Sequence, residues 1–83
     1  MNMHEFNNAR DLLSPFVEGS RKKVKGGFED NPAGVADLYV NAALLGLAII
    51  PITEGEDTAG TEPICAVIHA GASWAYLVPA TQL

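Results

Sequence analysis

Apolar residues recur at helical spacing along residues 3–18 of this chain. Intervals of three and four positions are typical of an amphipathic helix, and the stripe consists of Phe6, Ala9, Leu13, Phe16 and Val17. The dipeptide Ser14-Pro15 interrupts the stripe, and serine followed by proline is also a common helix start. We therefore predict either one helix or two short helices that meet at an angle, with Gly19 as the end.

Residues 19–30 are polar and combine three glycines with clustered charges. Glycine allows the backbone to turn, and neighbouring like charges are stable only in contact with water. This segment is predicted to be a loop or a short exposed hairpin between two helices.

A second helix is predicted to begin at Asn31-Pro32 and to end at Gly46. The Asn31 side chain can accept hydrogen bonds from first-turn N–H groups, and Pro32 lacks only an N–H that the helix does not need there. Apolar residues cover most of the circumference, with Val35, Leu38, Tyr39, Ala42 and Leu45 on one face and Ala36, Val40, Ala43 and Leu44 on much of the rest. All-round apolarity predicts a helix that is buried on more than one side.

From Leu47 onward the composition favours strands. Residues 47–53 contain three isoleucines, and Pro51 restricts such a strand to a sheet edge or a bulge. Residues 54–61 are acidic and predict a solvated connection. Two further apolar runs, 64–69 and 73–78, flank Gly71, which favours a tight hairpin. The expected fold is a single α+β domain spanning 1–83, in which two N-terminal helices precede a three-stranded antiparallel β-meander.

The composition predicts apolar surface that this chain cannot cover by itself. A domain of this size buries only about 60–65% of its unfolded surface, and only 18% of its residues are charged. Trp74 and Tyr76 alternate on one face of the last strand, and Ala75 and Leu77 are apolar on the other. Trp74 and Tyr76 either pack on the helices or form an exposed platform for a partner. We therefore expect self-association or a protein partner.

All five Lys and Arg residues lie between Arg10 and Lys25, whereas seven of the ten carboxylates follow Lys25. The net charge of −5 does not favour specific nucleic-acid binding. The clustered cations, which are Arg21, Lys22, Lys23 and Lys25, are the candidate contact for an anionic partner or a phosphate. The alternative is a loop that only improves solubility.

No metal, cofactor or catalytic site is predicted. Cys65 and His69 are four positions apart, about 13 Å along a strand, which is too far to share one zinc ion, and His4 adds only one distant ligand. His69 and Ser73 flank the predicted turn, but no carboxylate follows Glu62 to orient the histidine. Glycine-rich phosphate-binding motifs are absent from the sequence.

The sequence also lacks the pattern of a membrane-spanning helix or a secretory signal. The uncharged stretch 63–83 is interrupted by Pro63, His69, Gly71 and Pro79. A single cysteine excludes an internal disulfide, as expected of a reducing compartment. The expected location is the cytoplasm.

In size, acidity and lack of motifs, the chain resembles accessory proteins encoded by phages and mobile elements. This resemblance implies a non-enzymatic protein that inhibits or modulates a larger host protein or defence complex. It also implies that the cell is a host cell, or that the protein is associated with a virion. Two alternatives remain open. The first is a structural subunit such as a capsid or tail cement protein, and the second is a protein that binds or sequesters a small phosphate-bearing ligand.

Overall fold

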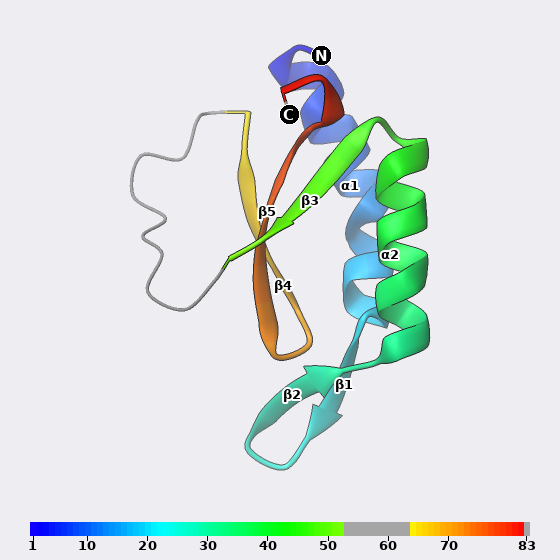
Figure 1. The fold of residues 1–83 in the computed structure, drawn as a ribbon, viewed down its shortest axis with the longest axis vertical. Helices are drawn as coiled ribbons and strands as arrows, with labels where there is room; N and C mark the ends of the chain where they lie inside the picture. Colours follow the sequence, from blue (N-terminus) through cyan, green and yellow to red (C-terminus); the bar gives the residue numbers. More distant parts are fainter. Residues whose placement is uncertain (53–63, 83) are drawn as a thin grey trace.

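The computed structural model describes residues 1–52 and 64–82. Two helices form a layer that covers one face of a three-stranded antiparallel sheet (Figure 1). A separate two-stranded hairpin projects from one end of these two layers. In chain order the elements are α1 (Met3–Gly19), β1 (Arg21–Val24), β2 (Gly27–Asp30), α2 (Pro32–Leu44), β3 (Leu47–Pro51), β4 (Ala66–Ala70), β5 (Ser73–Pro79) and the 3-10 turn η1 (Ala80–Gln82).

The helix α1 is continuous through Pro15 rather than broken there. Its start is fixed by Asn2, whose side chain accepts from the Glu5 N–H and donates to the Glu5 carboxylate. It ends at Gly19, as predicted. The Ser20 hydroxyl, which is buried, donates to the Val17 carbonyl at 2.6 Å and so closes the last turn.

The first turn of α2 lies directly against the end of α1. Pro32 occupies the first turn as predicted, but Asn31 does not cap the helix with its side chain. Instead, the Asn31 amide donates to the Gly19 carbonyl at 3.1 Å, which joins the two helices. A Cβ at Gly34 would collide with the backbone of Gly19 and Ser20. Glycine at this position is therefore what allows the close approach.

The predicted meander is wrong. The strand order is β3-β5-β4, so the last strand lies in the centre and pairs with both others. A two-residue turn at Gly71-Ala72 makes β4 and β5 neighbours, and Gly71 has the positive φ of 61° that such a turn requires. β5 takes the centre because it is the longest strand and the most buried, while Pro51 restricts β3 to an edge.

The fold also contains a second sheet. Of the two predictions for residues 19–30, the hairpin is correct, with β1 and β2 paired around Lys25-Gly26. The predicted acidic connection at 54–61 lies outside the described residues.

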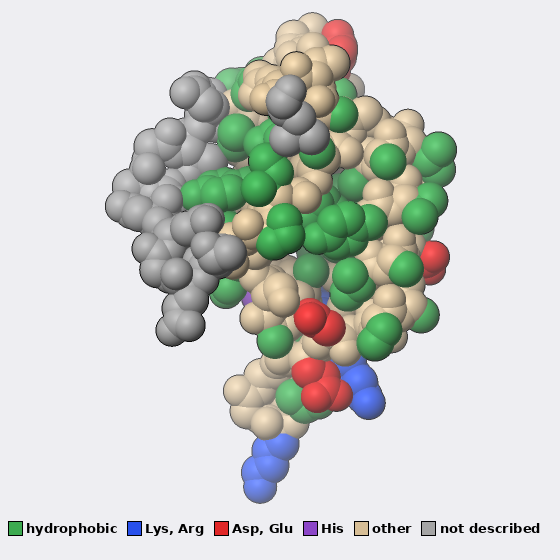
Figure 2. Space-filling view, in the orientation of Figure 1, with side chains coloured by type: hydrophobic (Ala, Val, Ile, Leu, Met, Phe, Trp, Pro, Cys, Tyr) green, Lys and Arg blue, Asp and Glu red, His purple; other side chains and the backbone are tan. Residues whose placement is uncertain are grey.

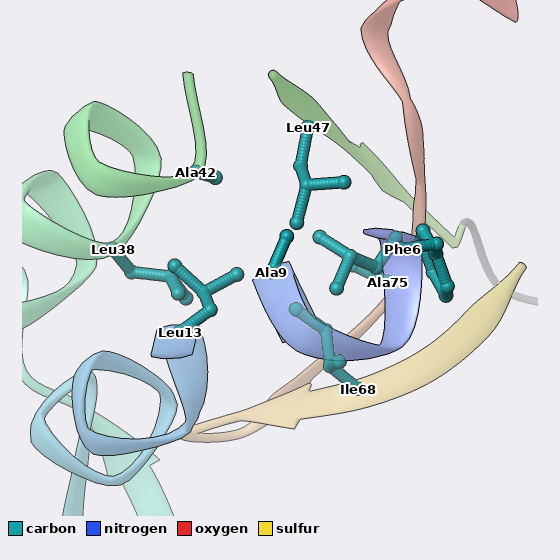
Figure 3. Close-up of a cluster of buried hydrophobic side chains, with 9 residues drawn as sticks. Phe6, Ala9, Leu13, Leu38, Ala42, Leu47, Ile68 and Ala75 are labelled. Atoms are coloured by element: carbon teal, nitrogen blue, oxygen red, sulfur yellow. The ribbon is translucent and has the colours of Figure 1, made fainter. Parts of the chain in front are cut away.

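The core lies between the helices and the inward face of the sheet (Figure 3). Leu13 of α1, Leu38 of α2 and Leu77 of β5 are fully buried at its centre. The inward face of the sheet consists of the odd positions of β3 and β5 and the even positions of β4, namely Leu47, Ile49, Ala66, Ile68, Ala70, Ala75 and Leu77. The intervening residues of the three strands therefore point away from the helices.

The prediction that α2 is buried on more than one side is wrong for the single chain. Leu38 and Ala42 are buried, but Tyr39, Val40 and Leu44 are exposed, Leu44 to 79%. Figure 2 shows hydrophobic side chains over this helix. An apolar stripe on α2 thus has no cover within the described parts of the chain.

Candidate protein-binding surface

The hairpin β1–β2 carries four of the five cations of the chain. Lys22 Nζ lies 3.6 Å from a carboxylate oxygen of Glu29, and Arg21 pairs with Glu18. Lys23 and Lys25 are exposed and form no ion pair with any described residue. In Figure 2, Lys and Arg side chains gather at this end of the molecule. The tip of the hairpin is therefore the part of the chain that can attract an anionic partner.

A row of ring contacts joins this hairpin to the main sheet. The Arg21 guanidinium lies 5.1 Å from the centroid of the Phe28 ring. Phe28 meets His69 edge-to-face with centroids 6.1 Å apart, and His69 lies 4.7 Å from Trp74. Lys23 lies opposite Phe28 on the same face of the hairpin. We call Arg21, Lys23, Phe28, His69 and Trp74 the aromatic–basic surface.

Trp74 and Tyr76 point away from the helices, on the outward face of the sheet. Trp74 is 54% exposed, and Tyr76 is partly buried. The register places Tyr76 between Ile50 of β3 and Val67 of β4, and both of these side chains are exposed. The predicted packing of this aromatic pair on the helices is therefore wrong, and of the two side chains Trp74 is the exposed one.

Asp30 fixes the hairpin β1–β2 against the turn between β4 and β5. Its Oδ1 accepts from the Ala72 N–H at 3.1 Å, and its Oδ2 accepts from the Ser73 hydroxyl at 3.3 Å. Gly71 leaves no room for a side chain, because a Cβ there would collide with Asp30. These contacts hold Phe28 within reach of His69.

The structure brings Arg21, Lys23 and Trp74 onto one surface but separates the other predicted residues from it. Lys22 points to the opposite face of the hairpin, Lys25 lies in its turn, and Tyr76 lies further along the sheet. Sequence reasoning missed Phe28 and Asp30. The available signal was a two-residue turn at Lys25-Gly26, because the register around such a turn pairs Phe28 with Lys23 and Asp30 with Arg21 on one face.

A cavity of about 290 Å³ opens beside the aromatic–basic surface, between α1 and β4. Its polar lining comes from Arg10, Asp11, Ser14, Arg21 and His69. A guanidinium nitrogen of Arg10 lies 3.8 Å from a carboxylate oxygen of Asp11, and the two side chains are 44% and 75% exposed. A second cavity of about 130 Å³ lies between α2 and the sheet and is mainly apolar.

The candidate chemical groups do not combine. The Ser73 hydroxyl bonds to Asp30 while the His69 ring lies against Trp74, so the serine and the histidine do not form the hydrogen-bonded pair of a nucleophilic site. Within residues 1–52 and 64–82, no three His, Cys, Asp or Glu side chains form a group that could hold a metal ion. Over the same residues, no helix is long and apolar enough to cross a membrane.

Comparisons with protein-family models, curated proteins and solved structures found no match to this chain.

Proposed function

We propose that this chain is a non-enzymatic protein-binding protein and that the aromatic–basic surface meets its partner. The row Arg21–Phe28–His69–Trp74, outside the core, is the observation that carries the proposal. Tryptophan and arginine are enriched among residues that dominate binding energy, and exposed large apolar groups often mark interfaces. An exposed Trp74 contributes little to the fold, whereas burial against a partner would stabilise a complex.

The partner we propose is a larger protein with an acidic surface. Lys23 on the aromatic–basic surface and Lys25 in the turn of the hairpin pair with no described carboxylate. They supply the charge complementarity that accelerates association. Inhibition or modulation of a host enzyme or defence complex, by a phage or mobile-element accessory protein, is the proposed role. The single Cys65 suits action in the reducing cytoplasm of a host cell, and association with a virion is the alternative location.

Affinity purification from the native host tests this proposal. The bait is the tagged wild-type chain, compared with Trp74→Ala and with Leu44→Ser, a matched change of an exposed apolar residue on α2. We expect one stoichiometric protein to be recovered with the wild type and with Leu44→Ser but not with Trp74→Ala. A wild-type chain that remains monomeric and recovers no partner would contradict the proposal.

The exposed stripe on α2 favours a second candidate, a structural subunit packed among neighbours. Ala36, Val40, Ala43 and Leu44 recur at intervals of three and four, which is the spacing of a helix–helix seam. Size exclusion with light scattering would then give an oligomer for the wild type and a monomer for Leu44→Ser. Recovery of a partner that Leu44→Ser loses and Trp74→Ala keeps would likewise favour this alternative.

A further inference from the structure

The outward edge of β4 carries backbone groups that no strand in the described chain uses. The Trp74 carbonyl accepts from the Ile52 N–H at 2.9 Å, on the β3 side of the central strand. In an antiparallel sheet the N–H and C=O of one residue point to the same side of the strand, so both groups of Trp74 point toward β3 and away from β4. Trp74 lies opposite His69 of β4, and these two residues therefore form a non-hydrogen-bonded pair. The N–H and C=O groups of His69, and by the same alternation those of Val67, therefore point away from β5.

The two edges of the sheet are not equivalent. On β3 the corresponding outward positions include Pro51, which has no N–H to offer an added strand. β4 consists of Ala-Val-Ile-His-Ala and has none of the proline or charged residues that usually protect an open edge. An edge of this kind can pair with an extended segment of another chain.

The cavity beside this edge determines which segment fits best. Val67 and His69 line it from the strand, while Arg10, Asp11 and Arg21 line it from the other side. Arg10 lies 3.8 Å from Asp11 and Arg21 pairs with Glu18, so an entering carboxylate would join these exposed ion pairs. Arg21 Nε is buried and has no hydrogen-bond partner. A volume of about 290 Å³ is slightly below the roughly 300–1,000 Å³ typical of small-molecule sites, so it suits an inserted side chain. Arginine forms short, charge-assisted and often bidentate hydrogen bonds with carboxylates, which are the common anionic side chains of proteins.

Building on the proposed function, we propose that the partner supplies an extended peptide segment that pairs with β4 as an added strand. An Asp or Glu side chain of that segment enters the cavity between Arg10 and Arg21. A second copy of this chain fits less well, because pairing of β4 with β4 about a two-fold axis would bring the arginines of both copies together. The edge of β4 and the aromatic–basic surface adjoin, since His69 belongs to both.

The probe for the test is a displayed library of random linear dodecapeptides, selected on the full chain. The most enriched peptide is then measured against the wild type, Val67→Pro and Val67→Ala. Proline removes the outward N–H while the bonds to β5 remain, because they come from the neighbouring residues. Alanine keeps the N–H and removes only an exposed side chain. We expect Val67→Pro to weaken binding by about tenfold or more, since a peptide carbonyl is left unpaired, and Val67→Ala to bind as the wild type does.

A second measurement avoids dependence on the folding of Val67→Pro. In the wild-type chain, the amide hydrogens of Val67 and His69 should exchange rapidly when free and slowly with the peptide bound. Replacing the Asp or Glu of the peptide with Asn or Gln should weaken binding to the wild type by about fivefold. The same replacement should weaken binding to the Arg10→Gln variant by a smaller factor, because one of the two cations that face the carboxylate is already lost.

Other outcomes would overturn the inference. A peptide that binds Val67→Pro as tightly as the wild type, without protection of the two amides, excludes strand addition. Loss of self-association in Val67→Pro would assign the edge to a second copy. Recovery of a host partner without any enriched peptide would overturn strand addition and leave the proposed function intact. Absence of both would contradict the proposed function as well.

Discussion

The two hairpins of this molecule differ in what holds them in place. In β4–β5, Ile68, Ala75 and Leu77 are buried beneath the helices, so burial of one face stabilises the hairpin. In β1–β2, residues 21–24 and 27–30 are all described and none is buried. That hairpin is held at its base by the bonds of Asp30 and by the ring contacts of Phe28.

This difference separates stability from binding. A hairpin held by burial loses stability when its inward side chains are cut back. A hairpin held at its base can present its tip to a partner, because the tip residues Lys23 and Lys25 make no contact that the fold requires. Substitutions in the two hairpins should therefore have different effects, and the comparison gives a graded set of predictions.

The largest expected effect is that of Leu77→Ala in β5. Leu77 is fully buried, and a buried Leu→Ala change typically costs about 2–5 kcal/mol in free energy of unfolding. The control is Phe28→Ala in β2, which removes a larger but 42% exposed side chain and should cost at most about 1 kcal/mol. Urea unfolding of the three proteins measures both values. Equal losses would show that the hairpins are not stabilised differently.

Gly71→Ala should have the next largest effect. A positive φ costs a non-glycine residue about 1–2 kcal/mol, and the added Cβ would also collide with Asp30. Gly26→Ala in the other hairpin is the matched control, because Gly26 also has positive φ (90°) but has open space around it. We expect Gly71→Ala to be more destabilising than Gly26→Ala by about 1–3 kcal/mol, the usual cost of overpacking.

The double variant Gly71→Ala with Asp30→Ala distinguishes a collision with the Asp30 side chain from a collision with its backbone. A Cβ at Gly71 would meet the backbone N and Cα of Asp30 as well as its carboxylate. Adding Asp30→Ala to Gly71→Ala should therefore fail to restore stability. Restoration would mean that only the carboxylate stands in the way, and that the backbones of the hairpins can separate at little cost.

Asp30→Ala tests the junction between the hairpins. It removes the acceptor for the Ala72 N–H and the Ser73 hydroxyl, and each exposed hydrogen bond contributes about 0.5–1.5 kcal/mol. The ring contact of Phe28 with His69 should weaken as the hairpin moves away, which a change in the His69 ring proton shifts would report. Glu29→Ala, on the opposite face, loses only the surface pair with Lys22 and should leave both the stability and these shifts unchanged.

Local patterns predicted most of the elements. The stripe of Phe6, Ala9 and Leu13 located α1, and Gly71 located the tight turn, because each signal depends on neighbouring residues alone. The order of the three strands was not predictable in this way. The order depends on which strand buries the most surface once all three strands have assembled into a sheet. The alternation of apolar and polar residues within β4 or within β5 does not contain this information.

The candidate surface was predictable only in pieces. The sequence identified the cations of 21–25 and the alternation of Trp74 with Tyr76, but as two unconnected alternatives. What connects them is the approach of Phe28 to His69, across more than forty positions of sequence. That contact requires Asp30 to hold the turn at Gly71, and long-range hydrogen bonds of exposed polar residues leave no periodic signal.

The smallest effect on stability is expected from neutralising the tip of β1–β2. Lys23→Gln combined with Lys25→Gln should change the free energy of unfolding by no more than about 0.5 kcal/mol, as is usual for exposed surface residues. If the partner is acidic, association with the protein recovered by affinity purification should become slower and less sensitive to salt, while dissociation changes little.

Lys22→Gln is the control, because Lys22 points to the other face and pairs with Glu29. Stopped-flow association at several salt concentrations measures the difference. An equal effect of Lys22→Gln would mean that only the net charge of the hairpin matters, whereas no effect of either variant, together with loss of binding in Trp74→Ala, would restrict the contact to the main sheet.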